Sequence, residues 1–141
     1  MSDDLCYLTA TEALARFADR SLSPVEMLQA QIARAEATRE TINAFADTYF
    51  DDALDQARAS EARWARGAPV GCLDGLPVAI KDESLIKGKR TTFGSLTHKD
   101  FVPDHTSVIN ERIMAEGGIV HARTTTPEFS CAGFTWTRLW G

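Results

Sequence analysis

The chain has few of the features that mark several particular protein classes. It has only three cysteines in 141 residues, Cys6, Cys72 and Cys131, and their odd number and wide spacing suggest neither a disulfide framework nor a zinc site. Such sparing use of cysteine is typical of a reduced intracellular protein. No apolar run approaches the ~20 residues of a membrane span, and the acidic residues 1–4 lack the regions of a signal peptide. We therefore expect a soluble, cytoplasmic protein with no membrane partner.

Basic residues are outnumbered by acidic ones. Lys and Arg together number 15 against 20 Asp and Glu, which gives a formal net charge of -5. Because phosphate binding needs clustered Lys and Arg, nucleic acid is not expected as a direct partner. The short basic run 87–90 is typical of a solvated loop. The composition, 44% hydrophobic and 25% charged, is that of an ordinary globular domain, and the length fits one modest domain.

Helix signals dominate the first half of the chain. Two capping boxes, Thr9 to Glu12 and Ser23 to Glu26, each mark a helix start. The second box has Pro at the first helical position, and apolar residues follow it at helical spacing, which predicts a helix over 24–37. A further helix is predicted over 51–66, where Ala, Leu, Glu and Arg are frequent and Gly67 provides an end.

Short apolar segments between the helices predict strands at 43–49, 78–80 and 119–122. The run at 78–80 is continuously apolar, so we expect a strand buried on both faces. Residues 84–103 show no period and predict a long irregular connection, and a helix is expected from 108 to the glycines at 117–118.

The alternation of strands and helices predicts an α/β fold, a partial mixed sheet flanked by helices. Residues 1–42 would be leading helices and 43–141 the start of the α/β core. Three strands are few for a doubly covered sheet. The tail ends on large aromatic side chains that favour a partner surface, Phe134, Trp136 and Trp140. We therefore expect residues 1–141 to be the N-terminal fragment of a single larger domain.

Lys81 follows the strand predicted at 78–80 and is the candidate catalytic residue. A lysine there can lay its stem on apolar surface and keep its ammonium in water. Alternatively, burial can disfavour the charged form and make the amine a general base. The carboxyl ends of strands are where α/β sheets usually bind ligands. Position alone leaves both interpretations open.

The sequence around Lys81 resembles the segment that holds the catalytic lysine of amidase-signature serine hydrolases. The segment here is Gly75-Leu76-Pro77-Val78-Ala79-Ile80-Lys81-Asp82. Three further pieces resemble the family in order: Gly88 with Thr91-Thr92-Phe93-Gly94-Ser95, Pro103-Asp104 with the helix to Gly117-Gly118, and Arg123-Thr124-Thr125-Thr126-Pro127-Glu128-Phe129. Each piece is weak alone, but their order and spacing are specific together. The resemblance is close over about residues 73–141.

The resemblance implies the N-terminal part of the amidase-signature fold and hydrolysis of a small carboxamide. In this mechanism a serine attacks the carbonyl carbon, and a second serine on a cis peptide relays its proton to a neutral lysine, here Lys81. Amides of a glycine-rich loop hold the oxyanion. No cofactor and no metal are implied. Neither serine of the mechanism is expected in this chain, because none of its serines lies in a Gly-Gly-Ser-Ser-Gly-Gly context, so the chain alone should be inactive.

Two positions depart from the family pattern. Thr125 stands where the family often has Asn, and Ala122 where it often has Gly, so a polar role at Thr125 is in doubt. Asp82 either tunes Lys81 or is a turn-forming or solvated residue. Ser95 either supports the lysine by hydrogen bonding or shapes a tight turn. The remaining polar candidates have no metal-ligand spacing, no catalytic partner, or a simpler structural role. They are His98, His105, His121, Thr124, Thr126, Glu128 and Cys131.

Three functional classes remain open. The parent protein is a stand-alone amidase, a component like that of glutamyl-tRNA amidotransferase that passes ammonia to a partner enzyme, or a non-catalytic remnant that keeps the sheet. Besides a small amide substrate, the expected partners are a second copy of the chain or a missing C-terminal remainder.

Overall fold

The structure is a computed structural model that describes residues 3–141. Residues 1 and 2, part of the acidic start predicted not to be a signal peptide, lie outside the described residues. The α-helices are α1 (Ala10–Asp19), α2 (Pro24–Ile42), α3 (Phe50–Ala65) and α4 (Val108–Ala115), and the strands are β1 (Phe45–Thr48), β2 (Pro77–Lys81) and β3 (Ile119–Thr124). Short 3-10 helices are η1 (Asp3–Tyr7), η2 (Leu96–His98) and η3 (Glu128–Ser130).

Both predicted capping boxes are present. The Thr9 side chain accepts a hydrogen bond from the Glu12 amide, and the Ser23 amide donates to the Glu26 carboxylate at 2.9 Å. Helix α2 continues past the predicted end at 37 to Ile42, because the chain meets no helix breaker before Asn43, which adopts a left-handed conformation with φ 51°. Helix α3 matches its prediction to within one residue at each end.

The three strands form one mixed sheet in the order β1-β3-β2. Strand β3 is antiparallel to β1 and parallel to β2, and Lys81 at the end of β2 pairs with Thr124 at the end of β3. This confirms the predicted α/β class and the partial mixed sheet flanked by helices. The central strand is the best buried, with Ile119, Ala122 and Arg123 nearly or fully enclosed.

The prediction that the strand at 78–80 is buried on both faces is wrong. Ile80 is buried, but Ala79, which points to the opposite face, is exposed. The reason is that β2 is an edge strand in this chain, and the described residues cover only one of its faces at this point.

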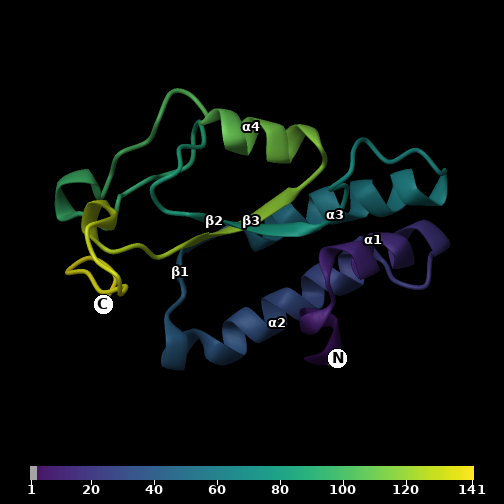
Figure 1. Cartoon of the computed structure of the whole chain (residues 1–141), viewed down its shortest axis with the longest axis horizontal. Helices are drawn as coiled ribbons and strands as arrows, with labels where there is room; N and C mark the ends of the chain where they lie inside the picture. Colours follow the sequence, from purple (N-terminus) through teal and green to yellow (C-terminus); the bar gives the residue numbers. More distant parts are fainter. Residues whose placement is uncertain (1–2) are drawn as a thin grey trace.

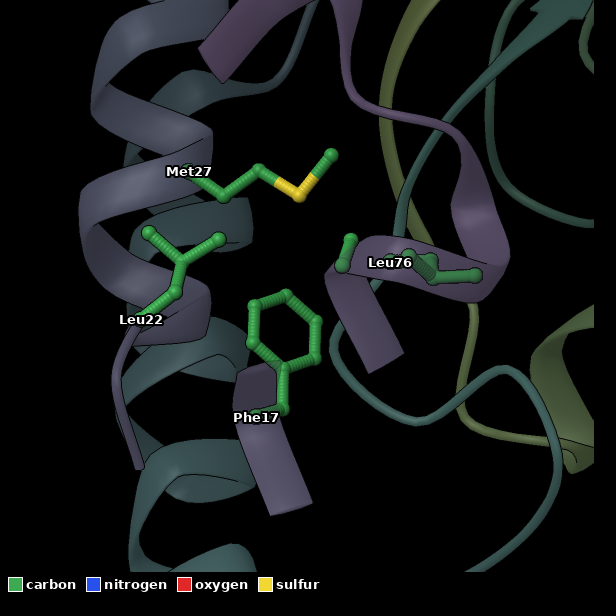
Figure 2. Close-up of a cluster of buried hydrophobic side chains, with 5 residues drawn as sticks. Phe17, Leu22, Met27 and Leu76 are labelled. Carbon is green, nitrogen blue, oxygen red and sulfur yellow. The ribbon is translucent and has the colours of Figure 1, made fainter. Parts of the chain in front are cut away.

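The sheet lies between helices on its two sides. In Figure 1, α4 lies above the sheet and α1 and α2 lie below it. Of two apolar clusters, one joins α1 and α2 to the residue before β2, and the other joins α2 and α3 to β3. The first holds Ala13, Phe17, Leu22, Met27 and Leu76 (Figure 2), and the second holds Leu28, Ala53, Ala57 and Ile119. The core therefore lies on the side of the sheet that α1, α2 and α3 cover.

Helix α4 occupies the predicted place but shares little of the core. Of its residues only Asn110 is buried, and its side-chain amide donates to Ser84 Oγ and the Leu85 carbonyl, both at 2.9 Å. Val108 and Ile109 are 62% and 64% exposed. Helix α4 is therefore fastened by polar contacts and presents apolar side chains to solvent.

The tail only partly matches its prediction. Phe134 and Trp136 are exposed, as expected of side chains without a partner surface. Trp140 is instead half-buried, because its indole N–H donates to Thr92 Oγ1 at 3.2 Å and its ring lies under the Arg90 guanidinium. Within residues 3–141, no helix is both long enough and apolar enough to cross a membrane.

Candidate active site

Lys81 is the last residue of β2, as the sequence predicts. Its Nζ donates a hydrogen bond to Ser130 Oγ at 2.9 Å and lies 3.1 Å from a carboxylate oxygen of Glu83. The Ser130 hydroxyl in turn donates to the Glu83 carboxylate. The amine, the hydroxyl and the carboxylate therefore form a closed triangle at the carboxyl end of the parallel strands β2 and β3.

A tight turn after β2 brings Glu83 back beside the amine. The amides of Glu83 and Ser84 both donate to the Lys81 carbonyl, at 2.8 and 3.1 Å. The hydrogen bond from Ser130, and next the contact with Lys81, hold the pKa of the Glu83 carboxyl below its ordinary value. Glu83 is thus kept as an anion next to the lysine.

The surroundings of Lys81 differ from those of a buried general base. Its side chain is 43% exposed, and that of Glu83 is 36% exposed, so both charged groups reach solvent. In this chain Lys81 is ion-paired and reaches solvent, as in the interpretation that keeps its ammonium in water. The described residues therefore do not enclose the amine.

Ser130 is the site residue that sequence reasoning missed. It is 49 positions from Lys81 in the sequence and lies outside any serine motif. Phe129 and Ser130 both adopt left-handed conformations, with φ 49° and 54°, and this turn directs the hydroxyl back toward β2. The parallel pairing of two strands was the available signal, because residues that follow β2 and β3 must then meet at one edge of the sheet.

Asp82 begins the turn after β2, as one interpretation expects, but its side chain lies in the interior, which makes the solvated interpretation wrong. It is fully buried, and its carboxylate accepts hydrogen bonds from the Thr92 amide at 2.8 Å and from the Thr92 hydroxyl. Its nearest cation is Arg123, whose Nη2 is 3.8 Å from Oδ1. The physical reason is that a buried carboxylate needs compensating donors and charge, and the 91–92 loop and β3 supply both.

Arg123 is also fully buried, on the central strand. Its Nη2 donates to Thr91 Oγ1 at 3.2 Å, while Nε and Nη1 have no hydrogen-bond partner among the described residues. Burial lowers the pKa of Arg123, and the Asp82 charge opposes that shift. Sequence reasoning noted Arg123 only as part of a family-like segment and gave it no role of its own.

Ser95 contacts Glu128 and not Lys81. Its hydroxyl donates to Glu128 Oε1 at 2.6 Å and accepts from the Thr97 amide at 3.3 Å. It therefore has the turn-shaping role that was one of its two predicted roles. Glu128, the first residue of η3, ties that turn to the segment that carries Ser130.

The other candidates lie apart from Lys81 or have structural contacts. His98 packs against Phe93, Phe101 and Phe129, His121 lies between Phe45 and Phe50, and His105 contacts Asp104. The Thr125 hydroxyl donates to the Ala44 carbonyl at 3.3 Å, and Cys131 Sγ contacts the Phe129 carbonyl. Over residues 3–141, no group of three or more His, Cys, Asp or Glu side chains could hold a metal ion.

Comparison with known proteins identifies the family. The Amidase family model matches residues 26–141, most of the chain. The chain belongs to the amidase family. This confirms the resemblance seen around Lys81, while the catalytic role of Lys81 stays a prediction.

Curated relatives of this amidase-family chain include an amidase and an amidotransferase subunit. It is 34% identical over 135 residues to "Amidase FG08078" of Gibberella zeae, across 95% of the chain and 25% of the relative. It is 37% identical over 132 residues to a glutamyl-tRNA(Gln) amidotransferase subunit of Chloroflexus aurantiacus, across 94% of the chain and 27% of the relative. The chain thus spans about a quarter of the length of these relatives.

Solved structures support the same fold. A bacterial aryl acylamidase of the amidase signature family matches with a TM-score of 0.83 and 26% identity, over 92% of this chain and 27% of that one. Fatty acid amide hydrolase matches with a TM-score of 0.91 and 25% identity, over 98% of this chain and 24% of that one. The described fold is therefore one portion of the amidase-signature fold.

Proposed function

We propose that the protein to which this chain belongs hydrolyses a carboxamide C–N bond, with Lys81 as its general base. The observation that carries the proposal is the 2.9 Å contact between Lys81 Nζ and a serine hydroxyl at the carboxyl end of β2. A relay serine that took the place of Ser130 at this distance could pass its proton to a neutral amine, which is the step that activates a serine nucleophile. The family assignment supports amide chemistry.

In the proposed mechanism the nucleophile and relay serines come from residues outside this chain. The nucleophile attacks the carboxamide carbon, and its proton passes through the relay serine to the neutral Lys81 amine. The same proton then returns to the departing nitrogen, and water hydrolyses the acyl-enzyme. For this sequence of steps Lys81 has to exchange its contacts with Glu83 and Ser130 for contacts with the relay serine.

We further propose that residues 1–42 are leading helices and 43–141 the start of the catalytic core of one larger domain. The quarter-length match to the relatives supports a larger protein, and the division follows the end of α2 at Ile42 and the start of the first strand at Phe45. The chain would supply the base but neither serine of the mechanism, so we expect it to be inactive alone. A cytoplasmic location is part of the proposal and agrees with three cysteines that form no disulfide within residues 3–141.

The alternative is an amidotransferase component that releases ammonia for a partner enzyme. The observation that favours it is the 37% identity to the glutamyl-tRNA(Gln) amidotransferase relative. Partner proteins that co-purify with the full-length protein, and ammonia release that depends on them, would distinguish it from a stand-alone amidase. A downstream coding sequence without a Gly-Gly-Ser-Ser-Gly-Gly segment would instead favour a non-catalytic remnant.

The test is ammonia release from simple carboxamides by the full-length protein. We expect Lys81→Ala to lower turnover by several orders of magnitude, since residues of one catalytic unit act together. Lys81→Arg should do no better, because arginine stays charged and cannot accept the proton. Lys87→Ala, at an exposed lysine beyond the strand end, is the matched control and should retain full turnover. Normal turnover by Lys81→Ala would remove Lys81 from the mechanism.

A further inference from the structure

We propose that the buried pair of Asp82 and Arg123 positions Lys81 for its chemistry. The inference rests on the proposed role of Lys81 as the base. Both residues are 0% exposed, and Arg123 Nη2 lies 3.8 Å from Asp82 Oδ1. The two side chains form an ion pair and hydrogen-bond to the 91–92 loop, while the Lys81 amine contacts Ser130 and Glu83. The pair would therefore act on Lys81 through the backbone and through other residues.

The first connection fixes the main chain of Lys81. The Asp82 amide donates to the Thr124 carbonyl at 2.9 Å, and it extends the β2–β3 ladder by one bond beyond Lys81. Arg123, the residue before Thr124 on β3, forms an ion pair with the Asp82 side chain. The backbone on the C-terminal side of Lys81 is therefore held to the central strand by a hydrogen bond and by an ion pair.

The second connection reaches the partner of Lys81. The Asp82 carboxylate binds the amide and hydroxyl of Thr92, and the Asp82 carbonyl accepts from the Phe93 amide at 3.0 Å. The Phe93 carbonyl accepts from the Phe129 amide at 2.8 Å, directly before Ser130. The turn that presents the Ser130 hydroxyl to Lys81 is therefore bonded to a loop that Asp82 holds. Asp82 thus organises both the amine and the hydroxyl that faces it.

Asp82 and Arg123 each compensate the buried charge of the other. A buried carboxylate without a cation, or a buried guanidinium without an anion, destabilises its surroundings far more than a neutral pair does. Burial lowers the pKa of Arg123, and among the charged groups around it Asp82 does most to oppose that lowering. Replacement of either residue alone should therefore disturb the hydrogen bonds that connect the pair to Lys81 and Ser130. Replacement of both residues should disturb these hydrogen bonds less.

The experiment measures the reactivity of the Lys81 amine in the folded chain. The probe is an acetylating N-hydroxysuccinimide ester, and the readout is the acetylation rate at Lys81 relative to Lys87 in the same sample, by mass spectrometry. We expect Asp82→Asn and Arg123→Met each to raise this ratio by about threefold or more, the size typical of coupled neighbours. The double variant should return toward the ratio of the unmodified chain.

Asp74→Asn is the matched control. Asp74 is equally buried and is held by Arg63 through two hydrogen bonds of 2.6 and 2.9 Å, but it precedes β2 rather than following it. This variant should lower stability and leave the Lys81 ratio unchanged. If the ratio rose as much in Asp74→Asn as in Asp82→Asn, general destabilisation would explain the effect and the proposal would be overturned.

A milder pair of variants covers the case in which the charge variants do not fold. Thr92→Val removes the hydroxyl donor to Asp82 and leaves the ion pair whole, whereas Thr92→Ser keeps the hydroxyl. The acetylation ratio of Lys81 to Lys87 should rise in Thr92→Val and stay unchanged in Thr92→Ser. An unchanged ratio in folded Thr92→Val contradicts the proposal. Acetylation requires no amide hydrolysis, so normal turnover by full-length Lys81→Ala would refute the proposed function without altering this result.

Discussion

At the residue scale, His121 is the clearest source of pH-dependent stability. Its ring is buried between Phe45 and Phe50, its Nδ1 has no partner among the described residues, and burial lowers its pKa from 6.5 to about 4. The unfolded chain therefore binds a proton at higher pH than the native chain does. Stability should be fully present above pH 6.5 and fall progressively as the pH is lowered toward 4, by up to about 3 kcal/mol.

The check is the free energy of unfolding in urea at pH 7.5, 6 and 5. His121→Phe keeps an aromatic ring without a titrating group, so most of this decline should disappear. His105→Gln, at an exposed histidine that contacts Asp104, is the control and should retain it. An equal decline in all three proteins would assign the effect to other groups.

The roles of single residues were harder to predict from the sequence than the helices and strands. The local sequence places Lys81 at a strand end but cannot show that Ser130 lies 2.9 Å from its amine, because that contact depends on two distant left-handed residues. It likewise leaves Asp82 open between tuning Lys81, forming a turn and facing solvent. The 91–92 loop and Arg123 on the central strand, both distant in sequence or structure from local signals, make the burial of Asp82 possible.

At the element scale, the start of α2 allows a direct test of how much its N-cap residue contributes to stability. Ser23 accepts a hydrogen bond from the Val25 amide at 2.9 Å, which satisfies one of the unpaired donors of the first turn. Ser23→Ala should therefore lower the free energy of unfolding by about 1 kcal/mol. Thr11→Ala, at an exposed position within α1, should change it by less than about 0.5 kcal/mol. Thermal or urea unfolding of the two variants side by side provides the measurement.

The elements themselves were largely predictable, because caps, glycines and apolar periods are local signals. The helix starts, the strand at 43–49 and the strand from 119 all occur where the sequence places them. What local signals could not give is the environment of each element. The apolar residues of α4 have the spacing of a core-facing helix, yet Val108 and Ile109 face solvent within this chain.

At the scale of the whole molecule, the exposed apolar side chains predict self-association of the isolated chain. Val108, Ile109, Phe134 and Trp136 are each more than 60% exposed. Large apolar side chains left exposed on α4 and on the tail favour contacts with another molecule. We expect sedimentation velocity to show a concentration-dependent rise in mass above that of the monomer.

The variant Ile109→Glu, which places a charge on the exposed face of α4, should shift this equilibrium toward the monomer. Thr41→Glu, at an exposed polar position on α2, serves as its control and should leave association unchanged. A compact monomer at all concentrations, for the unmodified chain, would contradict the prediction.

The strand order has a consequence for how the chain folds during its synthesis. Strands β1 and β2 make no ladder with each other, and the place between them is filled by β3, which is translated 38 residues after the end of β2. A nascent chain that ends before Ile119 therefore holds two strands with no partner. The sheet must close in one late step, when its middle strand leaves the ribosome, at the loop-closure cost of bringing distant segments together. Amide hydrogen exchange should accordingly show that β1 and β2 gain protection together, and only in chains long enough to include β3.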